Sequence, residues 1–187
     1  MTAGISVGRD ANELEVAFSS EHAFRDWYDR TLPRVFGYVL GHVAGDAELA
    51  EEITQQTFVD ALRDHRRFDG RSESATWLCA IARHKLADHY RRLDRQERRR
   101  LRIVVNEIDM DDGTRSWSAI EDRAAVEAVL TSMPAMQRAV LVFFHVDGLS
   151  TREIAKLLGK GEDATESLLR RARATFRDDF GKQDADG

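Results

Sequence analysis

The chain has 187 residues, of which 33% are charged and only 2 are proline, a composition typical of a helical protein with one ordinary domain or two small ones. The longest apolar run, Ala139–Phe144, is far shorter than the roughly 20 residues of a membrane span, and the N-terminus lacks a signal-peptide pattern. The single cysteine, Cys79, excludes an intramolecular disulfide and a cysteine-rich zinc site. We therefore expect a cytoplasmic, all-α protein with no membrane insertion, no metal site and no cofactor.

The formal net charge is -5, but the charges are unevenly distributed. Arginines crowd the segments 91–102 and 170–177, whereas acids gather in 46–52 and 107–112. Such a pattern can present a basic surface to DNA and an acidic surface to another partner. The alternative for any single cluster is a solvated helix face.

Residues 1–20 are polar and aperiodic, which predicts a mobile tail. A helical period of apolar residues begins at Glu21 and runs to Val43, and Pro33 within it should kink or split the helix. Gly45 ends this segment, and Asp46 is placed to cap the next helix.

That next helix has an apolar side and an opposite acidic side. A polar loop, residues 68–76, then leads into a helix in which Leu78, Leu86 and Tyr90 recur on one face while the cations fall off that face. Trp77 lies close to this stripe and is predicted to be core. These segments form a first helical domain over residues 21–92, although the last helix alone is also compatible with an ordinary amphipathic helix.

Residues 93–118 change from arginine-rich to acidic and predict a flexible linker, helical at most at its start. A second helical domain follows over residues 119–180, with a disordered tail at 181–187. Within it Ser150 and Glu153 have capping-box spacing, and Gly159 separates this short helix from a longer one. The pattern indicates a helix-turn-helix, with a plain three-helix bundle as the alternative.

Five segments together carry a family resemblance. DAELAEEITQQTFVDAL and FDGRSESATWLCAIARHKLADHYRR in the first domain, then MPAMQRAVL, GLSTREIAKLLG and LLRRAR in the second, resemble the extracytoplasmic-function sigma factors, small two-domain subunits of bacterial RNA polymerase. Each motif alone is weak, whereas their order and spacing together are specific. The resemblance implies a protein that binds core RNA polymerase, directs it to promoters and opens the DNA, and that has an anti-sigma protein as a further kind of partner.

The resemblance also implies which residues make each contact. Core polymerase would bind the acidic helix through Asp46, Glu48, Glu51, Glu52, Gln55, Gln56 and Phe58. The minus-ten element and the melted non-template strand would meet Arg67, Phe68, Arg71, Ser72, Glu73, Ser74, Thr76, Arg83, His84, Asp88, Arg91 and Arg92. The double-stranded minus-thirty-five element would meet Ser150, Thr151, Arg152, Ala164, Thr165, Glu166, Ser167, Arg170, Arg171 and Arg173.

The sequence departs from the family pattern at several of these positions. Ser74 stands where the family usually has an aromatic residue, and Gln56 replaces a common acid. Glu166 lies in a recognition helix where the family tends to carry cations, which implies weak or unusual reading of the upstream element. A phosphate on Thr54 or Thr57 of the acidic helix is a further hypothesis, because it would add charge facing the polymerase.

Two other classes of protein remain as alternatives. A stand-alone helix-turn-helix regulator explains the second domain but leaves the acidic helix and the loop before Trp77 without a purpose; such a regulator would bind DNA without polymerase. An enzyme is disfavoured, because Cys79, His84 and His89 do not have a known zinc spacing and no glycine-rich phosphate loop is present.

Overall fold

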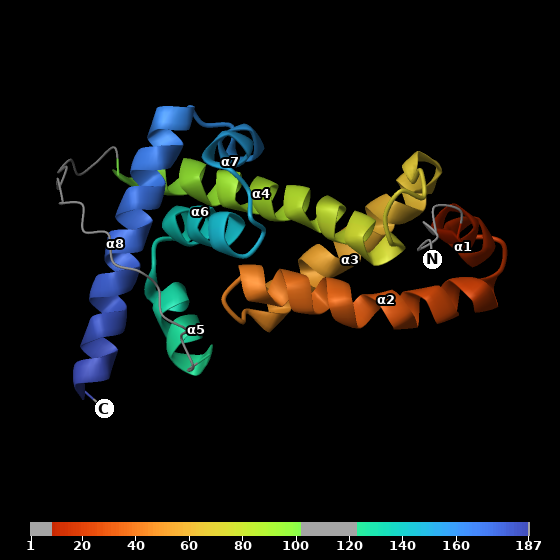
Figure 1. Ribbon diagram of the computed structural model, residues 1–187, viewed down its shortest axis with the longest axis horizontal. Helices are drawn as coiled ribbons and strands as arrows, with labels where there is room; N and C mark the ends of the chain where they lie inside the picture. The colour runs from red at the N-terminus through yellow and green to blue at the C-terminus, as the bar shows by residue number, and fades with distance from the viewer. Residues whose placement is uncertain (1–8, 102–122, 187) are drawn as a thin grey trace, which may run out of the picture. The chain divides into compact units, whose positions relative to one another are not determined.

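The computed structural model describes residues 9–101 and 123–186, and within these ranges every regular element is a helix (Figure 1). The elements are α1 (Arg9–Ala17), α2 (Glu21–His42), α3 (Ala47–Asp64), the 3-10 turn η1 (His65–Arg67), α4 (Ser74–Leu101), α5 (Arg123–Ser132), α6 (Ala135–His145), α7 (Thr151–Leu158) and α8 (Glu162–Asp186). The chain divides into two compact units at Leu86 and Ala87, so that α4 contributes to both. The predicted all-α class is confirmed.

In the first unit, α2 and α3 pack against each other across a tight turn (Figure 1). Ser20 caps α2 by accepting a hydrogen bond from the Ala23 backbone N–H (3.2 Å). The turn uses positive φ angles at Ala44 (54°) and Gly45 (79°). Asp46 then caps α3, as predicted, by accepting from the Leu49 N–H (3.0 Å).

The core of the first unit is built around Trp27, which is 1% exposed. The ring of Phe58 meets it edge-on at 5.6 Å, and Phe18 and Phe24 pack on it at 5.6 and 5.8 Å between centroids. Nearly full burial of a phenylalanine such as Phe58, which is 4% exposed, contributes about 1.5–3 kcal/mol. Because the indole is buried, its N–H needs a partner, and it finds one in the Ser74 hydroxyl (3.1 Å).

The structure corrects one sequence prediction about this unit and excludes one of the two alternatives in another. Arg9–Ala17 is helical rather than part of a mobile tail, because Leu14 and Ala17 lie on one face and are buried, each 2% exposed. The helix α2 also continues through Pro33 without splitting. Because Pro33 has no N–H, the backbone carbonyl of Asp29 lacks its helical partner, and Asp29 is exposed, so water can bond to that carbonyl.

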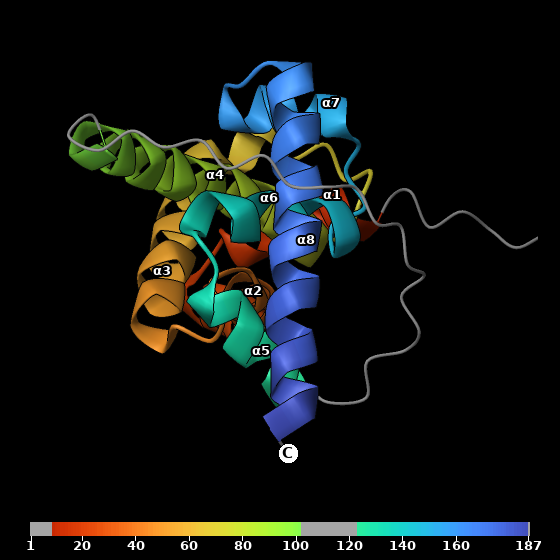
Figure 2. The ribbon, with the colours of Figure 1, turned by 90° about the vertical axis from the view of Figure 1, so that its left-hand side faces the viewer.

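The second unit comprises the end of α4 and α5–α8. The helix α8 packs against α5, α6 and α7 (Figure 2). Its buried residues Leu169 and Phe176 join Phe143 of α6 and Ile154 of α7 in the core. Tyr90, from the part of α4 that belongs to this unit, is 1% exposed and lies edge-on to Phe143, at 6.3 Å between ring centroids.

The helices α4 and α8 both extend beyond the predicted ends of their domains, residues 92 and 180. The helix α4 runs past residue 92 to Leu101, where the arginine-rich stretch is rich in helix formers and Arg98 pairs with Asp94 at i,i+4 (3.1 Å). The helix α8 continues past residue 180 to Asp186, where a disordered tail was predicted. The remainder of the predicted linker and residues 119–122 lie outside the described residues. In the described ranges, no helix is long and apolar enough to cross a membrane.

Candidate nucleic-acid and partner interfaces

The predicted acidic face of α3 is on the surface of the first unit. Glu48, Glu51, Glu52 and Gln55 are exposed, and Gln56 donates a hydrogen bond to Glu52 Oε1 (2.8 Å). Phe58 is not part of this face. It is 4% exposed and its ring packs 4.6 Å from that of Tyr28, so it belongs to the core, and its predicted partner contact is corrected.

Two exposed apolar side chains, which were not among the predicted contact residues, extend this face. Val59 and Leu62 are 52% and 42% exposed and follow Gln55 at four- and three-residue steps, the spacing that places residues on one side of a helix. We call Glu48, Glu51, Glu52, Gln55, Val59 and Leu62 the docking face. The spacing of Val59 and Leu62 from Gln55 along the helix could have indicated this in the sequence.

A groove of about 380 Å³ opens between α2 and α3 beside the docking face. Its lining combines apolar residues of α2 with polar residues of α3: Tyr28, Leu32, Pro33, Phe36, Glu51, Thr54 and Gln55. A groove lined by several apolar side chains and by the acid Glu51 is suited to a partner that carries both apolar and basic side chains.

The two threonines of α3 are inside the unit. Thr54 is 2% and Thr57 0% exposed, and the Thr57 hydroxyl donates to the Ile53 carbonyl (2.7 Å). A phosphate on Thr57 would have to enter the core, so the folded structure does not support phosphorylation there, whereas Thr54 borders the groove between α2 and α3.

The loop between η1 and α4 has a defined shape. Phe68 packs against Trp77 with 5.4 Å between ring centroids, and both rings lie against the core, which confirms the prediction for Trp77. Asp69 Oδ1 accepts from the Arg71 N–H (3.1 Å), and Gly70 has a φ of 68°. Asp69 and Arg71 thus form an Asx turn whose central residue, Gly70, has the left-handed φ that glycine adopts readily.

Some of the polar side chains predicted for the minus-ten contact lie in this loop or directly before it. Arg67 and Arg71 are exposed and pair with neighbouring carboxylates of Asp64 (3.6 Å) and Asp69 (3.3 Å). Ser72 is half-buried. Exposed ion pairs of this kind contribute little free energy, so the two arginines can leave these carboxylates and bind phosphates instead.

The start of α4 is tied to α2. Arg34 forms an ion pair with Glu73 and donates a second hydrogen bond to Thr76 Oγ1 (3.3 Å). Unlike the exposed Glu73 and Thr76, Ser74 is 3% exposed and hydrogen-bonded inside the unit, so the prediction that it contacts DNA is corrected.

Further along α4, Arg83 is half-buried and donates to the Tyr38 hydroxyl (3.3 Å), while His84 is exposed. Asp88, Arg91 and Arg92 follow in the part of α4 that belongs to the second unit; Arg91 pairs with Asp88, and Arg92 is exposed.

The helix α7 has the predicted capping box. Ser150 Oγ accepts from the Glu153 N–H (3.3 Å), and Glu153 Oε2 accepts from the Ser150 N–H (2.9 Å). Gly159 ends the helix at φ 64° and ψ 38°, with its N–H directed to the carbonyls of Ala155 and Lys156. Two helices joined by a left-handed glycine form a helix-turn-helix.

The first turns of α8 carry the predicted minus-thirty-five residues. Ala164, Glu166, Arg170 and Arg171 are exposed, Ser167 is half-buried, and Thr151 and Arg152 lie on the first turn of α7. Thr165 is 0% exposed and its hydroxyl donates to the Gly161 carbonyl (2.9 Å), so its predicted DNA contact is corrected. The Arg173 guanidinium lies over the Phe144 ring (4.7 Å). The outward cations of these turns are therefore Arg170 and Arg171.

Comparison with known proteins accounts for both units. The model of Sigma-70 region 2 matches residues 27–96, and that of Sigma-70 region 4 matches residues 123–176. The ECF RNA polymerase sigma factor SigC of Mycobacterium tuberculosis is 32% identical over 142 residues, which cover 76% of each chain. The chain belongs to the ECF RNA polymerase sigma factors.

Two further proteins are similar to this sigma factor. BldN of Streptomyces coelicolor is 35% identical over 162 residues, which cover 82% of this chain and 59% of that protein. The sigma factor RpoE of Bartonella quintana, solved with the anti-sigma factor NepR, shares the fold, with 18% identity, a TM-score of 0.51, and coverage of 84% and 96% of the two chains. The docking face and the loop lie within the region 2 match, the helix-turn-helix lies within the region 4 match, and α1 precedes both.

Proposed function

We propose that this sigma factor binds core RNA polymerase, directs it to specific promoters and initiates transcription by opening the DNA. The observation that carries the proposal is the exposed docking face on α3 within a chain that has regions 2 and 4 in order. A subunit that positions DNA needs no side-chain chemistry of its own, and RNA polymerase works beside the chromosome, which supports a cytoplasmic location.

The polymerase is the proposed partner of the docking face. Its acids would meet a basic surface, which steers association and sets the register, while Val59 and Leu62 add apolar contact. Exposed ion pairs contribute about 0.2–1 kcal/mol each, so the loss of two acids is expected to weaken binding by roughly two- to thirtyfold.

Promoter DNA is the second proposed partner. The loop over residues 68–73 and the exposed start of α4 would hold an unstacked base of the non-template strand, offsetting the few kcal/mol that opening the duplex costs. The helix-turn-helix would place the first turns of α8 in the major groove, where Arg170 and Arg171 face phosphates. The acidic Glu166 favours a cytosine amino group as its base contact.

An anti-sigma protein is a third proposed partner. The similar sigma factor RpoE of Bartonella quintana was solved in complex with such an inhibitor, NepR. The exposed apolar side chains Val59 and Leu62 offer an inhibitor a surface from which it would exclude the polymerase.

In-vitro transcription with purified core polymerase on a library of promoter fragments from the same genome tests the main proposal. We expect specific transcripts that weaken strongly with Glu51→Ala/Glu52→Ala. The matched control, Glu15→Ala/Asp178→Ala, removes the same charge at two exposed positions outside the docking face and should leave the transcripts unchanged. No transcript, combined with tight DNA binding in the absence of polymerase, would identify a stand-alone regulator instead.

A further inference from the structure

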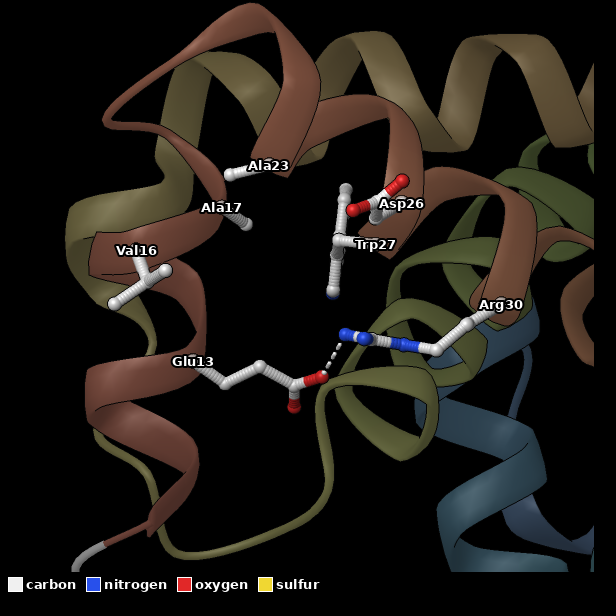
Figure 3. Close-up of a pocket in the computed structure, with 7 residues that line it drawn as sticks. All are labelled: Glu13, Val16, Ala17, Ala23, Asp26, Trp27 and Arg30. Carbon is white, nitrogen blue, oxygen red and sulfur yellow. Dashed lines mark hydrogen bonds and ion pairs between the residues drawn. The ribbon is translucent and has the colours of Figure 1, made fainter.

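The helix α1 is connected to the start of α4 through the side chain of Glu13. One carboxylate oxygen, Oε1, accepts a hydrogen bond from Arg30 of α2 (2.8 Å). The other, Oε2, accepts from the Ser74 hydroxyl (3.3 Å). Figure 3 shows Glu13 and Arg30 directed at each other across a pocket between α1 and α2, to which Trp27 also contributes. Glu13 therefore joins three helices.

Only one assignment of donors and acceptors is consistent with the two hydrogen bonds of Ser74. The indole N–H of Trp27 is a donor only, so the Ser74 oxygen accepts from it (3.1 Å). The single hydroxyl proton of Ser74 is then available for the Glu13 carboxylate. The result is a relay from Trp27 through Ser74 to Glu13, ending on a charged acceptor, which gives a stronger bond than a neutral one.

The relay sets the position where the promoter-facing loop ends. Ser74 is the first residue of α4, and the carbonyl of its neighbour Glu73 accepts from the backbone N–H groups of Thr76 (3.0 Å) and Trp77 (3.1 Å). The exposed side chains of Glu73 and Thr76 are tied to Arg34 from the other side. Ser74 is thus the buried anchor between two exposed loop-end residues.

The segment that follows α1 also contacts the element before the loop. Phe18 stacks on His65 of η1, with 4.7 Å between ring centroids and 29° between the ring planes. Leu14 and Ala17, both buried, hold this segment to the core. The α1 segment therefore contacts both ends of the loop over residues 68–73: His65 before it and Ser74 after it.

We propose that Glu13 is a positioning residue for promoter opening: through Ser74 it sets the geometry of the loop that meets the melted minus-ten strand. The helix α1, which precedes the region 2 match, is then a working part of the promoter-reading surface. This inference rests on the proposed function, and it concerns the opening step rather than the binding of polymerase, because Glu13 is not part of the docking face.

The test compares Glu13→Ala with Glu15→Ala, a matched control that removes the same charge from an exposed position on the same helix. Opening is followed as the permanganate reactivity of unpaired thymines in the complex with core polymerase. Loss of a hydrogen bond to a charged group corresponds to roughly a tenfold effect, so we expect Glu13→Ala to slow opening about five- to tenfold and Glu15→Ala to leave it unchanged. Glu13→Gln keeps an acceptor for Ser74 and should restore part of the rate.

Three readouts separate positioning from a general loss of folding. First, a promoter whose minus-ten segment is mismatched and already open should restore the rate of Glu13→Ala. Second, the relative rates on promoters that differ at single minus-ten bases should change. Third, Glu13→Ala combined with Ser74→Ala should be no slower than the slower single variant, because both substitutions break one relay.

Equal opening rates for Glu13→Ala and Glu15→Ala would overturn the inference. So would a uniform loss on all promoters that persists on the pre-opened template, because that pattern reports lower stability or weaker polymerase binding. If Glu13→Ala does not fold, as judged by circular dichroism, Glu13→Gln and Ser74→Ala carry the same comparison. Failure of the wild-type protein to form any open complex would instead overturn the proposed function.

Discussion

Replacement of Gly159 by alanine should loosen the helix-turn-helix without affecting the first unit. Gly159 has a φ of 64°, in the left-handed region that costs other L-residues about 1–2 kcal/mol. A Cβ there would lie 3.8 Å from the Arg91 Cδ, an ordinary contact, so the cost comes from the backbone rather than from a clash. Alanine recovers about 0.4–1 kcal/mol by restricting the unfolded chain, which leaves a net loss of about 1 kcal/mol.

Hydrogen exchange followed by mass spectrometry on the full chain measures this loss in each unit separately. A loss of about 1 kcal/mol corresponds to roughly fivefold faster exchange through cooperative opening. We expect this acceleration in peptides from α7 and α8, with no change in peptides from α2 and α3. Gly159→Asn is the matched control, because asparagine tolerates the left-handed region far better than alanine.

Equal exchange in Gly159→Ala and Gly159→Asn would refute the reasoning, since both would then respond to the added side chain rather than to backbone geometry. Acceleration across both units would also refute it, because the strain is local to one turn.

Two other predictions concern buried polar groups. Burial raises the pKa of Tyr90 above its ordinary 10.0, an effect only partly offset by Arg138, so Tyr90 stabilises the folded state below pH 10 and this contribution is lost as the pH rises above 10. Tyr90→Phe should therefore show a shallower decline of the free energy of unfolding above pH 10 in urea titrations; an unchanged slope would contradict this. Thr57→Glu should unfold the first unit by placing a carboxylate at a fully buried site, whereas Thr57→Val should stay folded. Circular dichroism checks this, and a folded Thr57→Glu protein that merely lost polymerase binding would revive the phosphorylation hypothesis.

The sequence was a good guide wherever the structure depends on near neighbours. The cap at Asp46 and the capping box of Ser150 and Glu153 are bonds between residues three apart, and both were predicted and observed. The helix-turn-helix itself follows from such local signals, because Gly159 ends one helix by a backbone conformation that glycine favours.

The sequence was a poor guide wherever a residue's role depends on distant partners. Ser74 looks like a loop residue, but it is buried by Trp27 and Glu13, which lie 47 and 61 positions away. Phe58 sits within the acidic segment, yet packing on Tyr28 assigns it to the core. The helix α1 was not predicted because it has only a few apolar residues. Whether these residues are buried depends on the surface of the first unit against which they pack.

The aromatic cluster around Trp27 bears on how this protein can be divided or recombined. A fragment or chimaera that begins at Trp27, where the region 2 match starts, would lose the ring contacts of Phe18 and Phe24 with the indole and would lose the Ser20 cap of α2. The boundary of sequence similarity is therefore not a boundary of independent folding, and an exchange of region 2 between relatives should carry the segment from α1 onward as a single piece.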